Sequence, residues 1–348
     1  MLAAVLHAAR SISADQVPDP ELIDPTDAIV QVTAACVCGS DLWPYRGVRE
    51  ASGRIGHEFV GVVQEVGAEV RTVKAGDFVI APFVWSDGTC ANCQAGIQTS
   101  CLHGGGWGAD DRNGHLVDGG QGEFVRVPQA DGTLVWAPVS ADSPLVPALL
   151  SLSDVMGTGH HAALAAGVTR GSTAVVVGDG AVGLSAVLAA SRLGAERIIA
   201  LSSHADRAEM ATRFGATDIV GVRGDEAVAA VRELTDGLGA AHVLECVGTT
   251  QSWDTAFGAT RPGGTIGYVG VPAGLTESFP IRKAFGGNIA VRGGVAPVRA
   301  YIPELLADVL DGTLDPSPVF TLELPLTEIA QAYRAMDERT AIKVLVRP

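Results

Sequence analysis

Lysine is scarce in this sequence. The three lysines are Lys74, Lys283 and Lys343, and the other side chains counted as Lys or Arg are all arginine. No stretch is rich in basic residues, and 39 acidic against 24 basic side chains give a net charge of −15. Such an excess of negative charge repels phosphate backbones and anionic lipid headgroups. We therefore expect neither nucleic acid nor a membrane as a partner.

Long apolar runs, internal repeats and low-complexity linkers are also missing. No apolar stretch reaches the roughly 18–20 residues of a membrane-spanning helix. Residues 1–6 are apolar but lack the positively charged segment with which a signal peptide begins, and polar residues follow by Ser11, so we expect no signal peptide. With 348 residues and 47% hydrophobic content, the chain is long enough for two domains with sizeable cores. We expect a cytoplasmic protein.

The six cysteines stand at positions 36, 38, 90, 93, 101 and 246. Because disulfides are rare in a reducing compartment, clustered cysteines in a cytoplasmic chain are typical of metal sites. Cys36 and Cys246 lie in apolar, strand-like stretches, where cysteine behaves as a small hydrophobic residue. We expect these two thiols to be inert parts of the core.

The character of the sequence changes near residue 155. Before it, short β-rich segments such as 59–66 and 77–80 alternate with Gly, Pro and Asp turns, as in an all-β domain. Later, a buried strand over 173–177 is followed by an apolar helix over 181–193 and a second strand over 197–201. This alternation is a βαβ unit with a parallel sheet.

These patterns predict an α/β protein of two domains. The β domain is expected over 1–153 and 294–348, and a doubly wound nucleotide-binding domain over 154–293. Further parallel strands are expected over 242–245 and 265–269. The last part of the chain, with a helix over 302–310 and a strand over 342–346, is expected to return to the first domain.

A glycine-rich loop follows the strand over 173–177. It reads Gly178-Asp179-Gly180-Ala181-Val182-Gly183 and opens the next helix. Backbone N–H groups of such a loop, together with the helix N-terminus, hold a pyrophosphate. We therefore predict a dinucleotide site at Gly178, Gly180, Ala181, Val182 and Gly183.

The choice of dinucleotide is expected to depend on the end of the second strand. An NAD site places Asp or Glu there to bind the ribose 2′-hydroxyl, but this chain has Ser202. Ser202, Ser203, His204 and Arg207 offer donors to a 2′-phosphate instead. We predict a preference for NADP(H) over NAD(H). The alternative is an ordinary polar loop that accepts both cofactors.

Three side chains predict a catalytic zinc. Cys38, His57 and Asp154 supply a thiolate, an imidazole and a carboxylate, and a catalytic zinc takes three protein ligands with one position left open. Taken singly, Cys38 is also typical of core, His57 of a satisfied polar residue and Asp154 of a helix N-cap. Asp41 is the expected partner that orients the His57 ring.

These motifs resemble the zinc-dependent alcohol dehydrogenases of the medium-chain dehydrogenase/reductase superfamily from end to end. Gly56-His57-Glu58 continues as Phe59-Val60-Gly61 with Gly67 and Val70, close to the family's zinc signature. The resemblance implies a GroES-like β domain interrupted by a Rossmann domain. It also implies Glu58 as a carboxylate beside the zinc and Ser40 as the proton-relay hydroxyl, while Trp43 replaces a histidine of many relatives.

Further residues are assigned only by this resemblance. Val247 and Gly248 match the segment lining the adenosine side, Val269, Gly270 and Val271 the segment meeting the nicotinamide carboxamide, and Lys343 a basic position reaching the pyrophosphate. A solvent-facing strand lysine is the alternative for Lys343. The family's structural zinc lobe falls on Asp87, Cys90, Cys93 and Cys101, with Asp in place of the first cysteine. The alternative there is a turn beside a degraded site.

The resemblance implies an oxidoreductase that is a homodimer or homotetramer. Trp43, Phe83 and Met156 are predicted to line the substrate pocket, with Trp85 and Trp107 as possible neighbours. An apolar, aromatic pocket suits hydrophobic alcohols, aldehydes or ketones. The alternatives are a polyol, sugar or specialised-metabolite dehydrogenase, a zinc-free quinone or enoyl reductase, and a non-catalytic cofactor-binding protein on the same fold.

Overall fold

The computed structural model describes residues 1–272 and 279–348. Two compact units are present: Met1–Asp154 together with Pro297–Pro348, and Val155–Ala296. The divisions predicted at 153/154 and 293/294 lie one and three residues before these bounds. None of the helices in the described ranges is both long and apolar enough to cross a membrane.

The first unit is built on β-sheets. Its strands are β1 (Leu2–Ala8), β2 (Ser11–Gln16), β3 (Ala28–Cys36), β4 (Gly53–Arg54), β5 (Phe59–Val66), β6 (Phe78–Ala81), β7 (Val84–Trp85), β8 (Gly105–Gly106), β9 (Phe124–Val127), β10 (Val135–Ala137), β17 (Phe320–Pro325) and β18 (Lys343–Arg347). Its helices are α1 (Leu42–Tyr45), α2 (Ala91–Gln94), α3 (Ala130–Thr133), α4 (Val146–Ser151), α11 (Val298–Asp311) and α12 (Ile329–Asp337), with 3-10 turns η1 (Gln98–Ser100), η2 (Ser317–Val319) and η3 (Leu326–Glu328).

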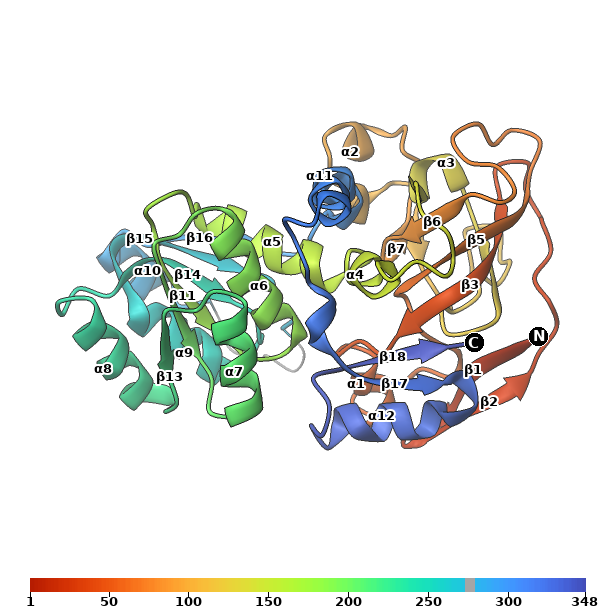
Figure 1. Ribbon diagram of the computed structural model, residues 1–348. Helices are drawn as coiled ribbons and strands as arrows, with labels where there is room; N and C mark the ends of the chain where they lie inside the picture. The colour runs from red at the N-terminus through yellow and green to blue at the C-terminus, as the bar shows by residue number, and fades with distance from the viewer. Residues whose placement is uncertain (273–278) are drawn as a thin grey trace. The chain divides into compact units, whose positions relative to one another are not determined.

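A seven-stranded sheet with the order β10-β6-β5-β3-β18-β17 dominates this unit, and β9 also pairs with β3. The C-terminal strand β18 runs antiparallel to β3, so the end of the chain completes the sheet begun by its first third (Figure 1). Trp85 and Trp107, considered above as pocket neighbours, are buried in the core of this unit. The indole N–H of Trp85 donates to Gly106 O and that of Trp107 to Pro82 O.

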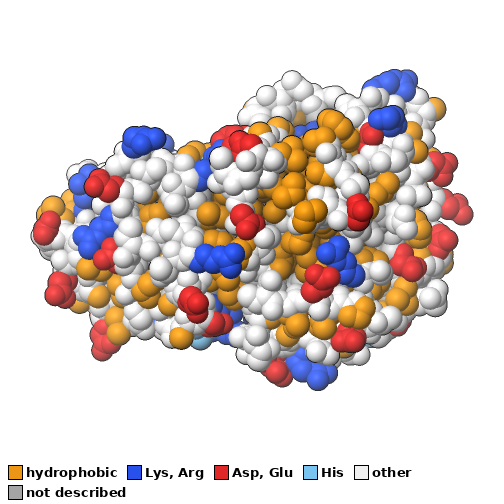
Figure 2. Space-filling model, viewed as in Figure 1, with side chains coloured by type: hydrophobic (Ala, Val, Ile, Leu, Met, Phe, Trp, Pro, Cys, Tyr) orange, Lys and Arg blue, Asp and Glu red, His pale blue; other side chains and the backbone are white. Residues whose placement is uncertain are grey.

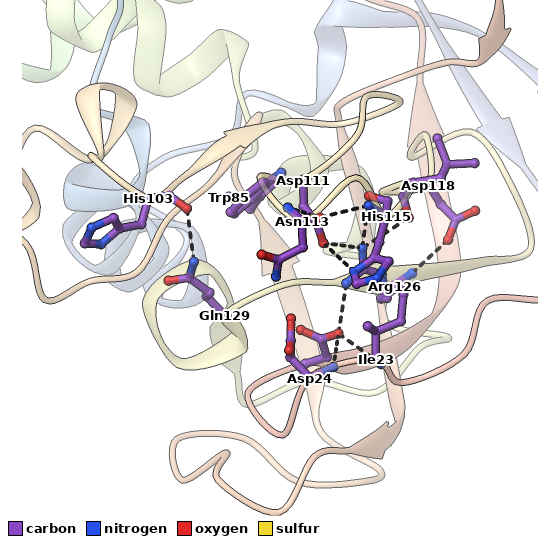
Figure 3. A network of polar contacts seen from close by, with 12 residues as sticks. Ile23, Asp24, Trp85, His103, Asp111, Asn113, His115, Asp118, Arg126 and Gln129 are labelled. Carbon is purple, nitrogen blue, oxygen red and sulfur yellow. Dashed lines mark hydrogen bonds and ion pairs between the residues drawn. The ribbon is translucent and has the colours of Figure 1, made fainter.

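A buried arginine ties the loops of this unit together. The Arg126 guanidinium lies 2.9 Å from Asp27 Oδ2 and 3.0 Å from Asp111 Oδ2, and it also donates to Leu116 O. Figure 3 shows how Arg126, on β9, gathers the loop that carries Asp111. Because a buried guanidinium requires charged or hydrogen-bonding partners, these contacts favour the observed arrangement of the loops.

The second unit alternates helices and strands. Its elements are α5 (Val155–Ala166), β11 (Thr173–Val177), α6 (Ala181–Arg192), β12 (Arg197–Leu201), α7 (Ala205–Arg213), β13 (Asp218–Val220), α8 (Gly224–Leu234), β14 (Ala240–Glu245), α9 (Thr250–Ala259), β15 (Thr260–Tyr268), α10 (Ile281–Gly287) and β16 (Ala290–Gly293). The strands form a parallel sheet in the order β13-β12-β11-β14-β15-β16. Helices cover both faces of this sheet (Figure 1).

This architecture confirms the predicted fold class, a GroES-like β domain and a doubly wound parallel sheet. The strands are nearly continuous apolar runs because helices on both faces bury them. Two elements begin four or more residues before their predicted start. Helix α11 begins at Val298, four residues before the expected start, and carries Pro303 in its interior. Strand β15 begins at Thr260, since the turn-like residues 261–264 form a register shift within the strand.

Acidic and basic side chains share the surface. On the face that Figure 2 shows, Lys and Arg side chains are scattered among Asp and Glu side chains and apolar ones. The acidic side chains are in excess over the whole sequence, 39 against 24.

Candidate metal centres and nucleotide site

Cys38, His57 and Asp154 meet at one end of the large sheet of the first unit. Strands β3 and β5 are antiparallel and pair Ala35 with Phe59, so the residues just after β3 and just before β5 lie side by side. Cys38 Sγ is 3.4 Å from Asp154 Oδ2, and His57 Nε2 is 3.6 Å from the same oxygen. Together with a Glu58 oxygen, one ligand atom from each residue lies within 4.8 Å of the others.

The electrostatics of this cluster favour a cation. Burial, with the charges of Glu58 and Asp154, raises the pKa of the Cys38 thiol to about 11. Burial alone would lower the pKa of His57, but the charges of Asp41 and Cys38 and the bond to Asp154 raise it well above its usual value. Neighbouring negative charge contributes to both shifts, although burial is the larger cause for Cys38. A divalent ion offsets that negative charge while releasing the ligand protons, so this donor set fits zinc.

Asp41 holds the His57 ring from behind. Its Oδ1 lies 3.1 Å from His57 Nδ1, while Oδ2 accepts the Cys38 N–H at 2.9 Å. Gln121 Nε2 also donates to Asp41 Oδ2, and the Tyr333 hydroxyl donates to Gln121 Oε1. This series of hydrogen bonds leaves His57 Nε2 directed toward the ligand cluster, as a metal-binding imidazole requires. Gln121 and Tyr333 carried no signal in the sequence because each is an isolated residue far from Asp41.

Glu58 and Lys343 form a buried ion pair next to the cluster. Both side chains are fully buried, and Lys343 Nζ is 2.8 Å from Glu58 Oε1. Lys343 also donates to Val37 O, and the thiol of Cys36 donates to Glu58 Oε2. The structure therefore places the ammonium of Lys343 in the interior of the β unit and not on a solvent-facing strand. Contact of this ammonium with a pyrophosphate stays a prediction.

The predicted relay and pocket residues have different surroundings. Ser40 Oγ donates to Cys38 Sγ at 3.3 Å, so its hydroxyl lies beside the ligand cluster. The Phe83 ring is 6.5 Å from the His57 ring, edge to face. Trp43 is half-buried on α1, shortly after Asp41. Met156 is fully buried at the start of α5, in the other unit.

A second ligand cluster contains Asp87, Cys90, Cys93 and Cys101, whose ligand atoms also lie within 4.8 Å of one another. Cys90 Sγ and Cys101 Sγ are 3.9 Å apart. N–H groups point at both sulfurs: Leu102 N donates to Cys90, and Asp87 N and His103 N donate to Cys101. Hydrogen bonds to sulfur favour the thiolate, the form that binds zinc.

Asp87 takes the place of the first thiolate in this second cluster. Burial alone would raise its pKa, but hydrogen bonds from the N–H groups of Cys90 and Thr89 and from His103 lower it. His103 Nδ1 lies 2.6 Å from Asp87 Oδ2. His103 was missed by the sequence analysis, although its position two residues after Cys101 was a usable signal. The contact with His103 orients the Asp87 carboxylate, as a hydrogen-bonding partner orients a metal ligand.

Replacing Cys93 by serine is expected to lower the zinc content from two ions per chain to one. The thermal unfolding midpoint is expected to fall by about 5 °C or more, since a structural zinc contributes directly to folding free energy. Metal analysis after dialysis and a thermal scan check both. The matched control is Cys246→Ser, which changes a thiol outside both clusters and is expected to keep two ions. Two ions and an unchanged midpoint in the Cys93 variant contradict the assignment.

The nucleotide loop lies at the carboxyl edge of the parallel sheet. Val177, at the end of β11, pairs with Leu201 of β12 and with Glu245 of β14. A side chain on Gly183 would place Cβ 2.0 Å from Gly178 O, whereas a Cβ on Gly180 would meet nothing within 4 Å. Gly183 is thus needed for packing, and Gly180 leaves the free backbone surface that a pyrophosphate needs above the N-terminus of α6.

Two further loops meet at the same edge. Glu245 Oε1 accepts the N–H groups of Val247 and Gly248, and Glu245 O accepts those of Val269 and Gly270. A Cβ on Gly248 would lie 2.2 Å from Val271 O, so the loops touch through glycine. Val247 and Val271 remain about half exposed there. Glu245, which the sequence analysis treated only as part of a strand, joins the predicted adenosine and nicotinamide segments.

The residues predicted to receive a 2′-phosphate gather around a carboxylate. Ser202 Oγ and His204 Nδ1 each lie 3.0 Å from Asp179 Oδ2, and Arg207 donates to Asp179 O. Ser203 accepts hydrogen bonds from Arg223 at 2.7 and 3.1 Å. The sequence analysis named neither Asp179 nor Arg223 as part of this site. Both come from segments that only the fold brings to the end of β12.

Two known protein families match this chain, each mainly in one of its two units. Residues 24–138 match the alcohol dehydrogenase GroES-like domain and residues 181–311 the zinc-binding dehydrogenase family. A probable zinc-binding alcohol dehydrogenase of Mycobacterium tuberculosis is 35% identical, over all of this chain and 89% of its own length. The NADP-dependent isopropanol dehydrogenase of Thermoanaerobacter brockii is 35% identical over 93% of this chain and 92% of its own.

A solved structure agrees with these sequence relatives. The alcohol dehydrogenase of Thermus sp. ATN1 has a TM-score of 0.91 at 32% identity and covers all of this chain and 99% of its own. The chain thus belongs to the zinc-dependent alcohol dehydrogenases of the medium-chain dehydrogenase/reductase superfamily. It is an oxidoreductase of alcohols and aldehydes that uses zinc and a nicotinamide cofactor.

Proposed function

We propose that this enzyme transfers hydride between NADP(H) and a hydrophobic alcohol or the matching aldehyde or ketone. In the proposal Cys38, His57 and Asp154 hold the catalytic zinc. The observation that carries it is the convergence of these three ligands, beside the hydroxyl of Ser40 and the ring of Phe83. A zinc ion bound there acts as a Lewis acid that lowers the pKa of an alcohol or polarises a carbonyl.

The side chains of the chain itself have separate tasks in this proposal. Asp41 is a positioning residue: by accepting from His57 Nδ1 it keeps Nε2 available to the metal. Ser40 accepts the proton of a bound alcohol during oxidation and returns it during reduction. Trp43 stands where many relatives have a histidine, and its indole has no acceptor nitrogen, so the proton leaves Ser40 by another route.

Phe83 and Trp43 support the hydrophobic substrate class. The Phe83 and His57 rings meet edge to face, and Trp43 is half-buried on the helix that follows Ser40. Aromatic walls contribute apolar contact area and few hydrogen bonds, which suits alkyl or aryl groups better than polyols. Met156 is proposed as a further lining residue.

The cofactor preference is proposed from the end of β12. Ser202 follows that strand without a carboxylate of its own, and Arg207 and Arg223 bring two guanidinium groups to the adjacent loops. Guanidinium groups suit the bidentate geometry of a phosphate. The T. brockii relative named above is NADP-dependent, which agrees with this proposal.

Three further points belong to the proposal. A structural zinc at Asp87, Cys90, Cys93 and Cys101 brings the content to two ions per chain. All six cysteines are free, and four of them, Cys38, Cys90, Cys93 and Cys101, belong to the two ligand clusters, where only a reduced thiol can bind metal; this suits the cytoplasm. A homodimer or homotetramer remains our expectation, and light scattering in solution measures it.

The test follows nicotinamide absorbance as zinc-loaded enzyme meets aromatic and long-chain aldehydes, acetone, and a sugar, with NADPH and NADH in parallel. We expect fast oxidation of NADPH with the apolar carbonyl compounds and loss of turnover after zinc is removed by a chelator. Turnover confined to the sugar contradicts the substrate class. A clear preference for NADH contradicts the cofactor assignment and leaves the zinc mechanism standing.

A further inference from the structure

Asp179 stands between the first two glycines of the nucleotide loop, and its side chain contacts residues that follow the next strand. The loop follows β11, while Ser202 and His204 follow β12. Ser202 Oγ and the ring nitrogen of His204 both lie 3.0 Å from Asp179 Oδ2, and Arg207 Nη1 lies 3.7 Å from Oδ1. Arg207 also donates to the backbone oxygen of Asp179 at 3.1 Å.

This carboxylate is well enclosed and ionised. Its side chain is 19% exposed and that of Arg207 only 9%. Burial alone would raise the pKa of Asp179, but hydrogen bonds from His204 and Ser202 and the charge of Arg207 lower it below its usual value. A fixed negative charge therefore stands among the donors at the end of β12.

The position of this charge matters for the ribose of a bound dinucleotide. In nucleotide-binding sheets of this type an acid at the end of the second strand binds the ribose 2′-hydroxyl. Here Ser202 follows the second strand, and the carboxylate at this place belongs to Asp179 of the glycine-rich loop. A 2′-hydroxyl can donate to the free lone pairs of such a carboxylate, whereas a 2′-phosphate is repelled by it and finds its donors already engaged.

We propose that Asp179 is the specificity-determining residue between the two nicotinamide dinucleotides, favouring the unphosphorylated ribose and limiting the affinity for the 2′-phosphate. The inference rests on the proposed function, because it assumes that the donors around Asp179 face the adenosine ribose. It differs from the sequence-based argument on Ser202, which considered the strand end without the loop. The site as built thus combines phosphate donors with one opposing acid.

The test compares dissociation constants of NADPH and NADH, measured by nicotinamide fluorescence without substrate, in wild type and in Asp179→Asn. Asparagine keeps the size and the acceptor oxygen but removes the charge. We expect the ratio of affinities to shift toward NADPH by about tenfold or more, because like charges at contact distance cost more than 1.4 kcal/mol. Asp179→Ala is expected to shift it in the same direction.

Glu209→Gln is the matched control. It removes one negative charge from an exposed position on α7, the helix that carries Arg207. We expect its affinity ratio to stay within about twofold of wild type, since exposed charges are screened by salt. A thermal scan of each variant separates a local effect from misfolding.

Two results overturn the inference: an Asp179→Asn ratio within twofold of wild type, or an equal shift in Glu209→Gln. The wild-type ratio alone tests the proposed NADP(H) preference. A wild type that prefers NADH, with a tenfold shift in Asp179→Asn, rejects that preference and supports the role of Asp179. A wild type that prefers NADPH, with no shift in Asp179→Asn, supports that preference and rejects the role of Asp179.

Discussion

Replacement of Cys38 by serine is expected to lower kcat/KM for an aldehyde by about a thousandfold or more and to reduce zinc from two ions per chain to one. A serine hydroxyl is a poor zinc ligand because it stays protonated near neutral pH. His57 and Asp154 then offer two ligands where three are proposed, too few to keep the ion through dialysis. Metal analysis and steady-state rates on the same dialysed sample check both parts.

Cys36→Ser is the matched control for this prediction. It makes the same change of thiol to hydroxyl two residues earlier, and a serine there still donates to Glu58 Oε2 as the thiol does. We expect this variant to retain two zinc ions. Unchanged turnover in Cys38→Ser, or loss of an ion from Cys36→Ser with retention in Cys38→Ser, contradicts the ligand assignment.

Glu58 gives the Cys38 experiment an informative intermediate result. One of its carboxylate oxygens lies within 4.8 Å of the other ligand atoms. If Glu58 replaces the missing thiolate, Glu58, His57 and Asp154 retain the ion as three ligands, and turnover is still expected to fall because the third ligand then comes from a different position around the ion. That outcome keeps Cys38 as a ligand and identifies Glu58 as a residue able to contact the metal.

The parts of the site that could be predicted from the sequence are those whose residues lie in or beside a clear strand, turn or helix pattern. Cys38 and His57 flank two strands with clear β patterning, and the glycine-rich loop stands between a strand and a helix. Once β3 and β5 pair, the positions of the first two ligands follow. The family resemblance then assigned Asp154, whose helix-capping alternative no local pattern excludes.

The contacts that the sequence could not predict join isolated residues of ordinary type. Lys343 and Glu58 are 285 positions apart, and Tyr333 and Gln121 are 212 apart. A lone lysine in a strand is usually solvent-facing, since burial of an ammonium costs several kcal/mol without a partner. That the partner exists depends on β18 lying beside β3. The sequence analysis assigned Asp179 no role for the same reason, since its partners Ser202 and His204 lie beyond the next helix.

Replacement of Lys343 by methionine is expected to destabilise the protein by about 3–5 kcal/mol, the cost of leaving one member of a buried ion pair without its partner. Lys343 Nζ and Glu58 Oε1 are 2.8 Å apart, and both side chains are fully buried. Denaturant unfolding of the zinc-loaded protein measures the loss. Lys74→Met is the matched control, because the Lys74 side chain is 80% exposed and its pair with Asp77 is worth about 1 kcal/mol or less.

The double variant Glu58→Gln with Lys343→Met separates the charge from the packing. With both charges removed, this site no longer holds an ion without its partner, and we expect recovery of most of the stability lost in Lys343→Met alone. NADPH affinity, measured on the same variants, tests the alternative role. If Lys343 acts on the pyrophosphate, its replacement weakens NADPH binding while stability stays near wild type. If Lys343 instead pairs with Glu58, Lys343→Met lowers stability. The double variant then restores stability, because Glu58→Gln removes the buried negative charge that lost its partner.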